Sequence, residues 1–138
     1  MKATVSVELS LPHSLETIWA LVGPFETMQT WFPGIIDIRI EGTGIGTIRH
    51  LTMSDGAIFS DQLTQQSNHQ YSYTIVAGEV PFENYLGTVS VIGDNGSSLL
   101  KYHATIDVSE ENHEPSVAFL SELYTNAFGN VKGMLAKT

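Results

Sequence analysis

Six short segments between residues 35 and 108 alternate apolar and polar side chains, and this alternation limits what the chain can fold into. A period of two is typical of β-strands with one buried face. Asp55-Gly56 and Asn95-Gly96 lie between such segments and are strong signals for two-residue hairpin turns. We therefore expect antiparallel strands at residues 35–41, 47–53, 58–65, 70–77, 84–92 and 99–108, with a further strand at residues 4–11.

Helical spacing of apolar residues occurs on both sides of this strand region. Ser14 is suited to cap a short helix that Gly23-Pro24 ends, and residues 25–31 add one or two turns before Pro33-Gly34. Residues 114–136 carry a wide apolar stripe, which predicts a long helix packed along a sheet. The stripe consists of Val117, Leu120, Tyr124, Ala127, Phe128, Val131 and Leu135.

Composition excludes several classes of protein. The 138 residues show no repeat or linker, so we expect a single domain over 1–138. The chain has no cysteine, its five histidines lack metal-ligand spacing, and its net charge is −9. These features argue against disulfides, against any metal or other cofactor, and against a nucleic-acid partner. With no signal-peptide pattern and no run of ~20 apolar residues to span a membrane, we expect a cytoplasmic protein.

The elements and their motifs resemble the helix-grip, START-like superfamily (SRPBCC), in particular its polyketide cyclase/dehydrase-like branch. The similar motifs are residues 17–25, 31–35, 54–56, 61–63, 71–75, 78–81 and 84–85. The resemblance implies an α+β helix-grip fold: a seven-stranded curved antiparallel sheet around a long C-terminal helix, with one or two short helices after the first strand. It also implies a deep apolar cavity that binds hydrophobic small molecules, and in some members cyclisation or dehydration.

Pairing across the two turns predicts which side chains face this cavity. With Asp55-Gly56 as a two-residue turn, His50 lies opposite Asp61 on the more apolar, inward face, and Arg49 lies outside. The Asn95-Gly96 turn places Tyr102 inward, opposite Val89. The ligand-binding candidates in the cavity and at its rim are Trp31, Phe32, Ile36, Phe59, Tyr73, Pro81, Phe82, Tyr85, Tyr102, Leu120, Tyr124 and Phe128.

Three functions stay open at this point. The first is binding of a lipid, polyketide or aromatic metabolite in the cavity. The second is a cyclase or dehydratase in which His50 acts as a base oriented by Asp61, although this pair would equally serve to orient a ligand or to satisfy its own hydrogen bonds. The third is a protein-interaction module, as a monomer or a homodimer, with Leu86 and Ile92 on the outer face.

Overall fold

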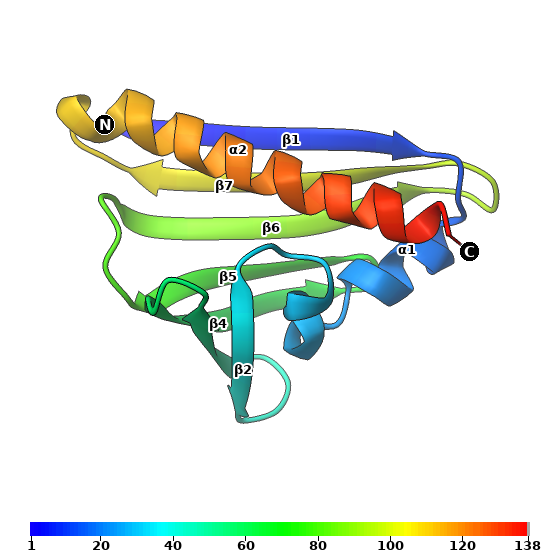
Figure 1. Cartoon of the computed structure of the whole chain (residues 1–138), viewed down its shortest axis with the longest axis horizontal. Coiled ribbons are helices and arrows are strands. Elements are labelled where there is room, and N and C mark those ends of the chain that lie inside the picture. Colours follow the sequence, from blue (N-terminus) through cyan, green and yellow to red (C-terminus); the bar gives the residue numbers. More distant parts are fainter. Residues whose placement is uncertain (138) are drawn as a thin grey trace.

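The computed structural model describes residues 1–137 and confirms the predicted helix-grip architecture (Figure 1). Seven strands and two short helical segments precede one long helix. In chain order the elements are β1 (Lys2–Leu11), α1 (Leu15–Val22), the 3-10 helix η1 (Phe25–Thr30), β2 (Ile35–Glu41), β3 (Ile48–Met53), β4 (Ile58–Ser67), β5 (Gln70–Ala77), β6 (Glu83–Gly93), β7 (Ser98–Asp107) and α2 (Glu110–Leu135).

The strands form one antiparallel sheet in the order β1-β7-β6-β5-β4-β3-β2, so β1 and β2 are its edges. Figure 1 shows α2 running along the β1 and β7 side, while the sheet bends until β2 stands almost across the direction of β1. The helices α1 and η1 lie near the C-terminal end of α2. This curvature leaves room between the sheet and α2, and that room is where the candidate site lies.

Side-chain caps fix where the two α-helices begin. Ser14 accepts a hydrogen bond from the Thr17 backbone N–H at 3.1 Å, as predicted for α1. Ser109 does the same for Asn112 at 3.2 Å, so α2 begins at Glu110, four residues before the expected start. The buried face of α2 contains most of the predicted stripe, including Leu120, Tyr124 and Phe128.

The register of β6 on β7 agrees with the sequence, whereas that of β3 on β4 does not. Tyr102 lies opposite Val89 as predicted. The β3–β4 loop holds three residues, 54–56, because the Met53 N–H bonds to the Ala57 carbonyl at 2.8 Å and Gly56 takes a φ of +91°. This one-residue shift turns every β3 side chain to the other face. Arg49 therefore lies opposite Asp61 inside the protein, and His50 lies opposite Ser60 outside.

A bulge in β2 overturns the prediction for Ile36. The pairing of β2 with β3 shifts between Ile35 and Asp37. Ile35 is consequently buried in the core, while Ile36 is 66% exposed and does not face the cavity. After the bulge the alternation resumes, and Ile38 packs against the core.

Candidate functional site

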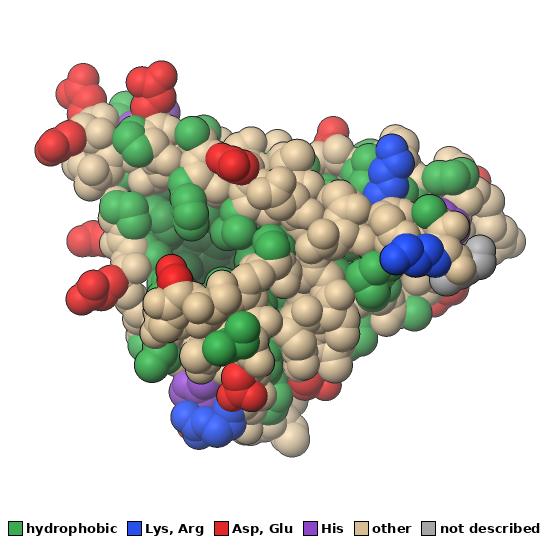
Figure 2. Space-filling model, in the orientation of Figure 1, with side chains coloured by type: hydrophobic (Ala, Val, Ile, Leu, Met, Phe, Trp, Pro, Cys, Tyr) green, Lys and Arg blue, Asp and Glu red, His purple; other side chains and the backbone are tan. Residues whose placement is uncertain are grey.

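A cavity of about 140 Å³ lies between the inner face of the sheet and α2. Figure 2 shows a hollow with hydrophobic walls beneath the N-terminal half of α2. Phe119 contributes to the lining from α2 although its side chain is 60% exposed, which places it at the mouth. The lining residues are Met28, Phe32, Leu51, Met53, Phe59, Asp61, Tyr73, Ile75, Val80, Phe82, Tyr85, Phe119, Leu120, Leu123 and Tyr124.

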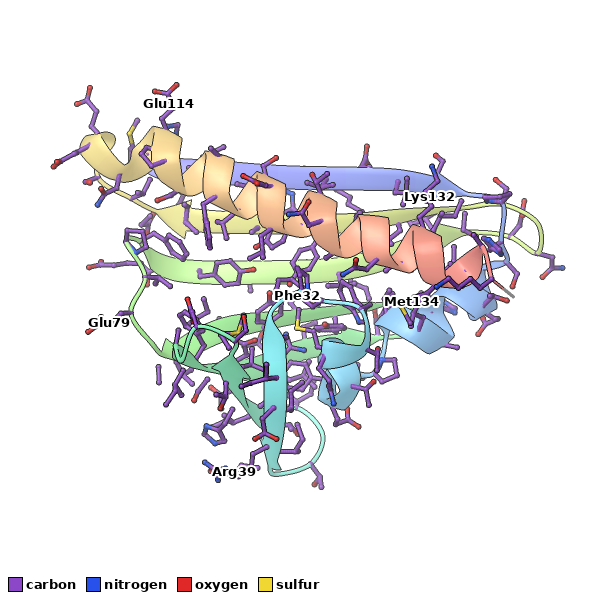
Figure 3. The ribbon with its side chains drawn as sticks, viewed as in Figure 1. Phe32, Arg39, Glu79, Glu114, Lys132 and Met134 are labelled. Atoms are coloured by element: carbon purple, nitrogen blue, oxygen red, sulfur yellow. The ribbon has the colours of Figure 1, made fainter. Side chains whose placement is uncertain are left out.

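Seven of the twelve ligand-binding candidates line this cavity, and their role in binding stays a prediction. They are Phe32, Phe59, Tyr73, Phe82, Tyr85, Leu120 and Tyr124. Figure 3 shows Phe32 just before β2, between that strand and α2, whereas Arg39 and Glu79 extend away from the body of the protein.

Three further candidates lie in the core beside this lining, and Pro81 lies elsewhere. Trp31 packs edge-on against Phe32 with ring centroids 5.9 Å apart. Tyr102 stacks on Tyr124 with a centroid distance of 3.9 Å, and Phe128 packs against Tyr102. Pro81 lines a neighbouring depression of about 460 Å³ next to Met1 and the start of α2, which shares Val80 and Phe82 with the cavity lining.

Sequence reasoning missed Leu51 and Met53 because the β3 register was wrong. Both residues alternate with His50 and Thr52, so placing His50 inside put them outside. It also missed Leu123, which lies one turn after Leu120 on α2. Helical spacing from Leu120 is the signal that points to Leu123.

Arg49 and Asp61 form a buried ion pair on the inner face of the sheet. Arg49 Nε donates to Asp61 Oδ2 at 2.9 Å, and the Arg49 side chain is 0% exposed. Arg49 Nη1 donates to the Phe25 carbonyl at 3.0 Å, and the guanidinium lies 4.0 Å from the Phe25 ring centroid and 4.7 Å from that of Tyr73. Arg49 Nη2 has no hydrogen-bond partner among residues 1–137. The positive charge is compensated by Asp61 and by three aromatic rings, those of Phe25, Tyr71 and Tyr73.

Asp61 is the only charged residue in the cavity lining formed by the described chain. Burial raises the pKa of its carboxyl, and the neighbouring Arg49 guanidinium opposes that increase. Oδ2 is taken by Arg49, while Oδ1 forms no hydrogen bond within residues 1–137. This second oxygen is the acceptor that Asp61 can offer to a bound molecule.

Four tyrosine hydroxyls join into a hydrogen-bonded chain beside this carboxylate. Tyr73 and Tyr85 hydroxyls lie 2.8 Å apart. The Tyr73 hydroxyl also bonds to that of Tyr102, and the Tyr85 hydroxyl bonds to that of Tyr124. Burial raises the pKa of all four hydroxyls well above 10, so they stay protonated at neutral pH. The cavity thus has an almost wholly apolar surface, and three of these hydroxyls and the carboxylate belong to residues that line it.

His50 takes no part in this site. Its Nδ1 bonds to Ser60 Oγ at 2.7 Å and its Nε2 bonds to Glu41 Oε1 at 3.1 Å, both on the outer face. The predicted pairing of His50 with Asp61 is wrong because the two side chains lie on opposite faces of the sheet. A mechanism in which Asp61 orients His50 as a base fails for the same reason.

The remaining predictions concern metals, membranes and the outer surface. Within residues 1–137 no group of three or more histidine, aspartate or glutamate side chains is arranged to hold a metal ion. No helix in the described part of the chain combines the length and the hydropathy needed to cross a membrane. Leu86 and Ile92 are exposed on β6, as expected, and their part in a dimer stays a prediction.

Comparison with known proteins gives a family and a set of related folds. The family model described as "Polyketide cyclase / dehydrase and lipid transport" matches residues 2–135. The solved structure of XoxI from Bacillus cereus is 24% identical with a TM-score of 0.87, covering 96% of this chain and 94% of its own. An uncharacterised protein from Bacillus thuringiensis is also 24% identical, with a TM-score of 0.83 and coverages of 96% and 98%.

A plant enzyme has the same fold. Norcoclaurine synthase from Thalictrum flavum, solved in complex with dopamine and hydroxybenzaldehyde, is 18% identical with a TM-score of 0.73, covering 99% of this chain and 88% of its own. A search of curated proteins found no match. At these identities the solved structures show that the fold is shared.

Proposed function

Because the chain belongs to the polyketide cyclase/dehydrase and lipid transport family, we propose that its cavity binds a hydrophobic small molecule about one aromatic ring in size. The cavity between the sheet and α2 carries this proposal. Fourteen of its fifteen lining residues are apolar or tyrosine, and Asp61 is the fifteenth. Such a lining offers apolar area for affinity and a few polar groups for orientation.

The volume of the cavity supports the size of the ligand. Pockets for drug-sized molecules hold about 300–1,000 Å³. An engineered apolar cavity of about 150 Å³ stays dry and takes up benzene. With about 140 Å³, this cavity fits one ring with a small substituent. A sterol or an extended polyketide would need movement of the residues at the mouth, such as Phe119.

Blocking the cavity tests the proposal. We expect saturable binding of ethylbenzene to the wild type, measured by calorimetry or by shifts of cavity NMR signals. Leu123→Trp places a larger side chain into the lining, so it should weaken binding at least about tenfold. Leu86→Trp makes the same chemical change on the outer face of β6 and should leave binding unchanged. Absence of ethylbenzene binding, or equal binding to both variants, would contradict the proposal.

A second candidate is catalysis on such a ligand, with Asp61 in place of His50 as the base. One observation favours it: Asp61 and three tyrosine hydroxyl groups belong to residues that line the same cavity. Asp61 Oδ1 would take a proton from a carbon next to a carbonyl, the C–H electron pair would form the C=C bond, and the carbonyl oxygen would become negative. A hydroxyl donor stabilises such an oxyanion.

Deuterium exchange tests this second candidate. Wild-type protein should speed the exchange of the methyl hydrogens of acetophenone in D2O, followed by NMR. Asp61→Asn lacks the base and should lose the acceleration, whereas His50→Ala should keep it. Equal rates in the presence and absence of wild-type protein would exclude this chemistry for aryl ketones and leave the binding proposal intact.

A further inference from the structure

Counting the hydrogens in the tyrosine chain shows that it has one donor to spare. The hydroxyls follow the order Tyr102, Tyr73, Tyr85, Tyr124, and three hydrogen bonds join them. Each hydroxyl brings one hydrogen, so four hydrogens are available. Three of these are used within the chain. One O–H group is therefore left without an acceptor inside the chain, whichever way the bonds run.

The surroundings of the four residues decide where this spare hydrogen lies. Tyr102 is fully buried, does not line the cavity, and has Tyr73 as its hydroxyl partner. A spare hydrogen on Tyr102 would be a buried, unsatisfied donor, which carries the full desolvation cost of the group. Tyr73, Tyr85 and Tyr124 all line the cavity. The favoured arrangement has Tyr102 donating to Tyr73, and the spare hydrogen on the hydroxyl of Tyr73, Tyr85 or Tyr124, the three residues of the chain that line the cavity.

We propose that the cavity selects one-ring ligands that carry a hydrogen-bond acceptor, such as an aryl carbonyl, because that acceptor takes the spare tyrosine hydrogen. This inference rests on the proposed function and names its ligand class. A ligand that offers only a donor leaves the spare hydrogen unmatched, and so does a hydrocarbon. Burial supports this assignment, since it raises the pKa of Tyr73, Tyr85 and Tyr124 and keeps their hydrogens in place.

Two probes of nearly the same shape test the inference. Acetophenone carries a C=O group where α-methylstyrene carries a C=CH2 group. The ratio of their dissociation constants therefore measures how much the hydrogen-bond acceptor contributes to binding. The triple variant Tyr73→Phe/Tyr85→Phe/Tyr124→Phe removes the hydroxyls of all three tyrosines that line the cavity and keeps their rings. Comparing the ratio between proteins cancels the different hydration of the two probes. We expect the preference for acetophenone to be about tenfold larger in the wild type than in the triple variant.

The control variant is Tyr102→Phe, which removes one hydroxyl of the chain outside the cavity lining. In this variant the spare hydrogen still lies on one of the three cavity-lining tyrosines. The ratio of the dissociation constants of the two probes should therefore stay within about twofold of the wild-type ratio. Binding of α-methylstyrene shows that each variant is folded. If the triple variant does not fold, the infrared C=O stretch of acetophenone bound to the wild type tests the inference instead. A hydrogen bond from a tyrosine hydroxyl to the carbonyl lowers the frequency of this stretch below its value in hydrocarbon.

The outcomes separate the two claims. If neither probe binds the wild type, both the proposed function and this inference fail. If both probes bind but the ratio is the same in wild type and triple variant, the acceptor inference is overturned and the binding function stands. A bound acetophenone whose C=O stretch equals its value in hydrocarbon also overturns the inference.

Discussion

Replacing Asp61 with asparagine removes one negative charge from the protein interior and keeps the shape of the side chain. Its partner Arg49 is 0% exposed and cannot deprotonate inside a protein. The variant therefore buries a positive charge without a counter-charge. We expect Asp61→Asn to lower the free energy of unfolding substantially, even though no apolar contact is lost.

The size of the effect follows from the surroundings of Arg49. Breaking a buried ion pair by removing one partner costs about 3–5 kcal/mol. The asparagine oxygen can still accept from Arg49 Nε, and the Phe25 and Tyr73 rings still face the guanidinium. We therefore expect the lower end, about 3 kcal/mol. Unfolding entropy of about 2.1 cal/mol/K per residue converts this, for 138 residues, to a Tm about 10 °C lower.

Urea unfolding followed by tryptophan fluorescence measures this change, because Trp31 is buried close to the cavity lining. Two further variants complete the comparison. Arg49→Met/Asp61→Leu removes both charges and should lie close to the wild type, as similar replacements elsewhere are neutral or stabilising. Arg49→Met alone leaves a carboxyl group that can neutralise itself by binding a proton, so its stability should depend on pH.

The stability of Arg49→Met should depend on pH through protonation of the Asp61 carboxyl. Burial already raises the pKa of Asp61, and loss of Arg49 removes the group that opposes the increase. Folded Arg49→Met then holds a proton that the unfolded chain releases near pH 3.9. Its free energy of unfolding should fall as pH rises from about 4 through the pKa of the folded state. An Asp61→Asn variant as stable as the wild type, or a double variant less stable than both single variants, would refute this reasoning.

Four further outcomes are expected. Gly129→Ala should raise the free energy of unfolding by about 0.5–1 kcal/mol, because the new methyl group meets no atom within 4 Å and alanine favours a helix, and thermal unfolding measures this. Gly87→Ala should instead lower it by about 1–3 kcal/mol and weaken ethylbenzene binding, because its Cβ would lie 2.6 Å from Tyr85 Oη. His50→Ala should leave the dissociation constant of ethylbenzene unchanged, since His50 contacts Ser60 and Glu41 outside the sheet; a clear loss would contradict the assigned site. The free energy of unfolding should fall above about pH 10, by up to about 1.4 kcal/mol per pH unit for each buried tyrosine with a raised pKa. The reason is that only the unfolded chain releases these protons. Absorbance at 295 nm should show tyrosine ionisation together with unfolding. The tyrosines concerned are Tyr73, Tyr85, Tyr102 and Tyr124.

The sequence was sufficient to predict the order of the elements and the inward face of β6 and β7. The alternation of apolar and polar residues in strands, and the helical spacing of apolar residues, directly reflect which side chains are buried. A two-residue turn at Asn95-Gly96 gave a register in which both β6 and β7 have one apolar face. The inward position of Tyr102 and its pairing with Val89 followed from that register.

The β3–β4 hairpin could not be predicted in the same way, because Asp-Gly suits loops of two or three residues. The assumed two-residue turn fixed the wrong register, and the apolar-inside rule then placed Arg49 on the outer face. Arg49 is tolerated inside because Asp61, the Phe25 carbonyl and the Phe25 ring surround it, and these partners are distant in sequence. Ile36 shows a similar limit: a bulge shifts the alternation of β2 within one strand.

The β2 bulge and the charges that follow it also affect how two molecules meet. β2 is an edge of the sheet, and an unpaired edge invites strands from other molecules. Beyond the bulge, Asp37, Arg39 and Glu41 alternate along this edge and all are exposed. An incoming strand would have to match the irregular hydrogen-bond spacing and accept three charges of mixed sign. The same irregularity that misled the prediction for Ile36 thus protects the sheet from growing into an aggregate.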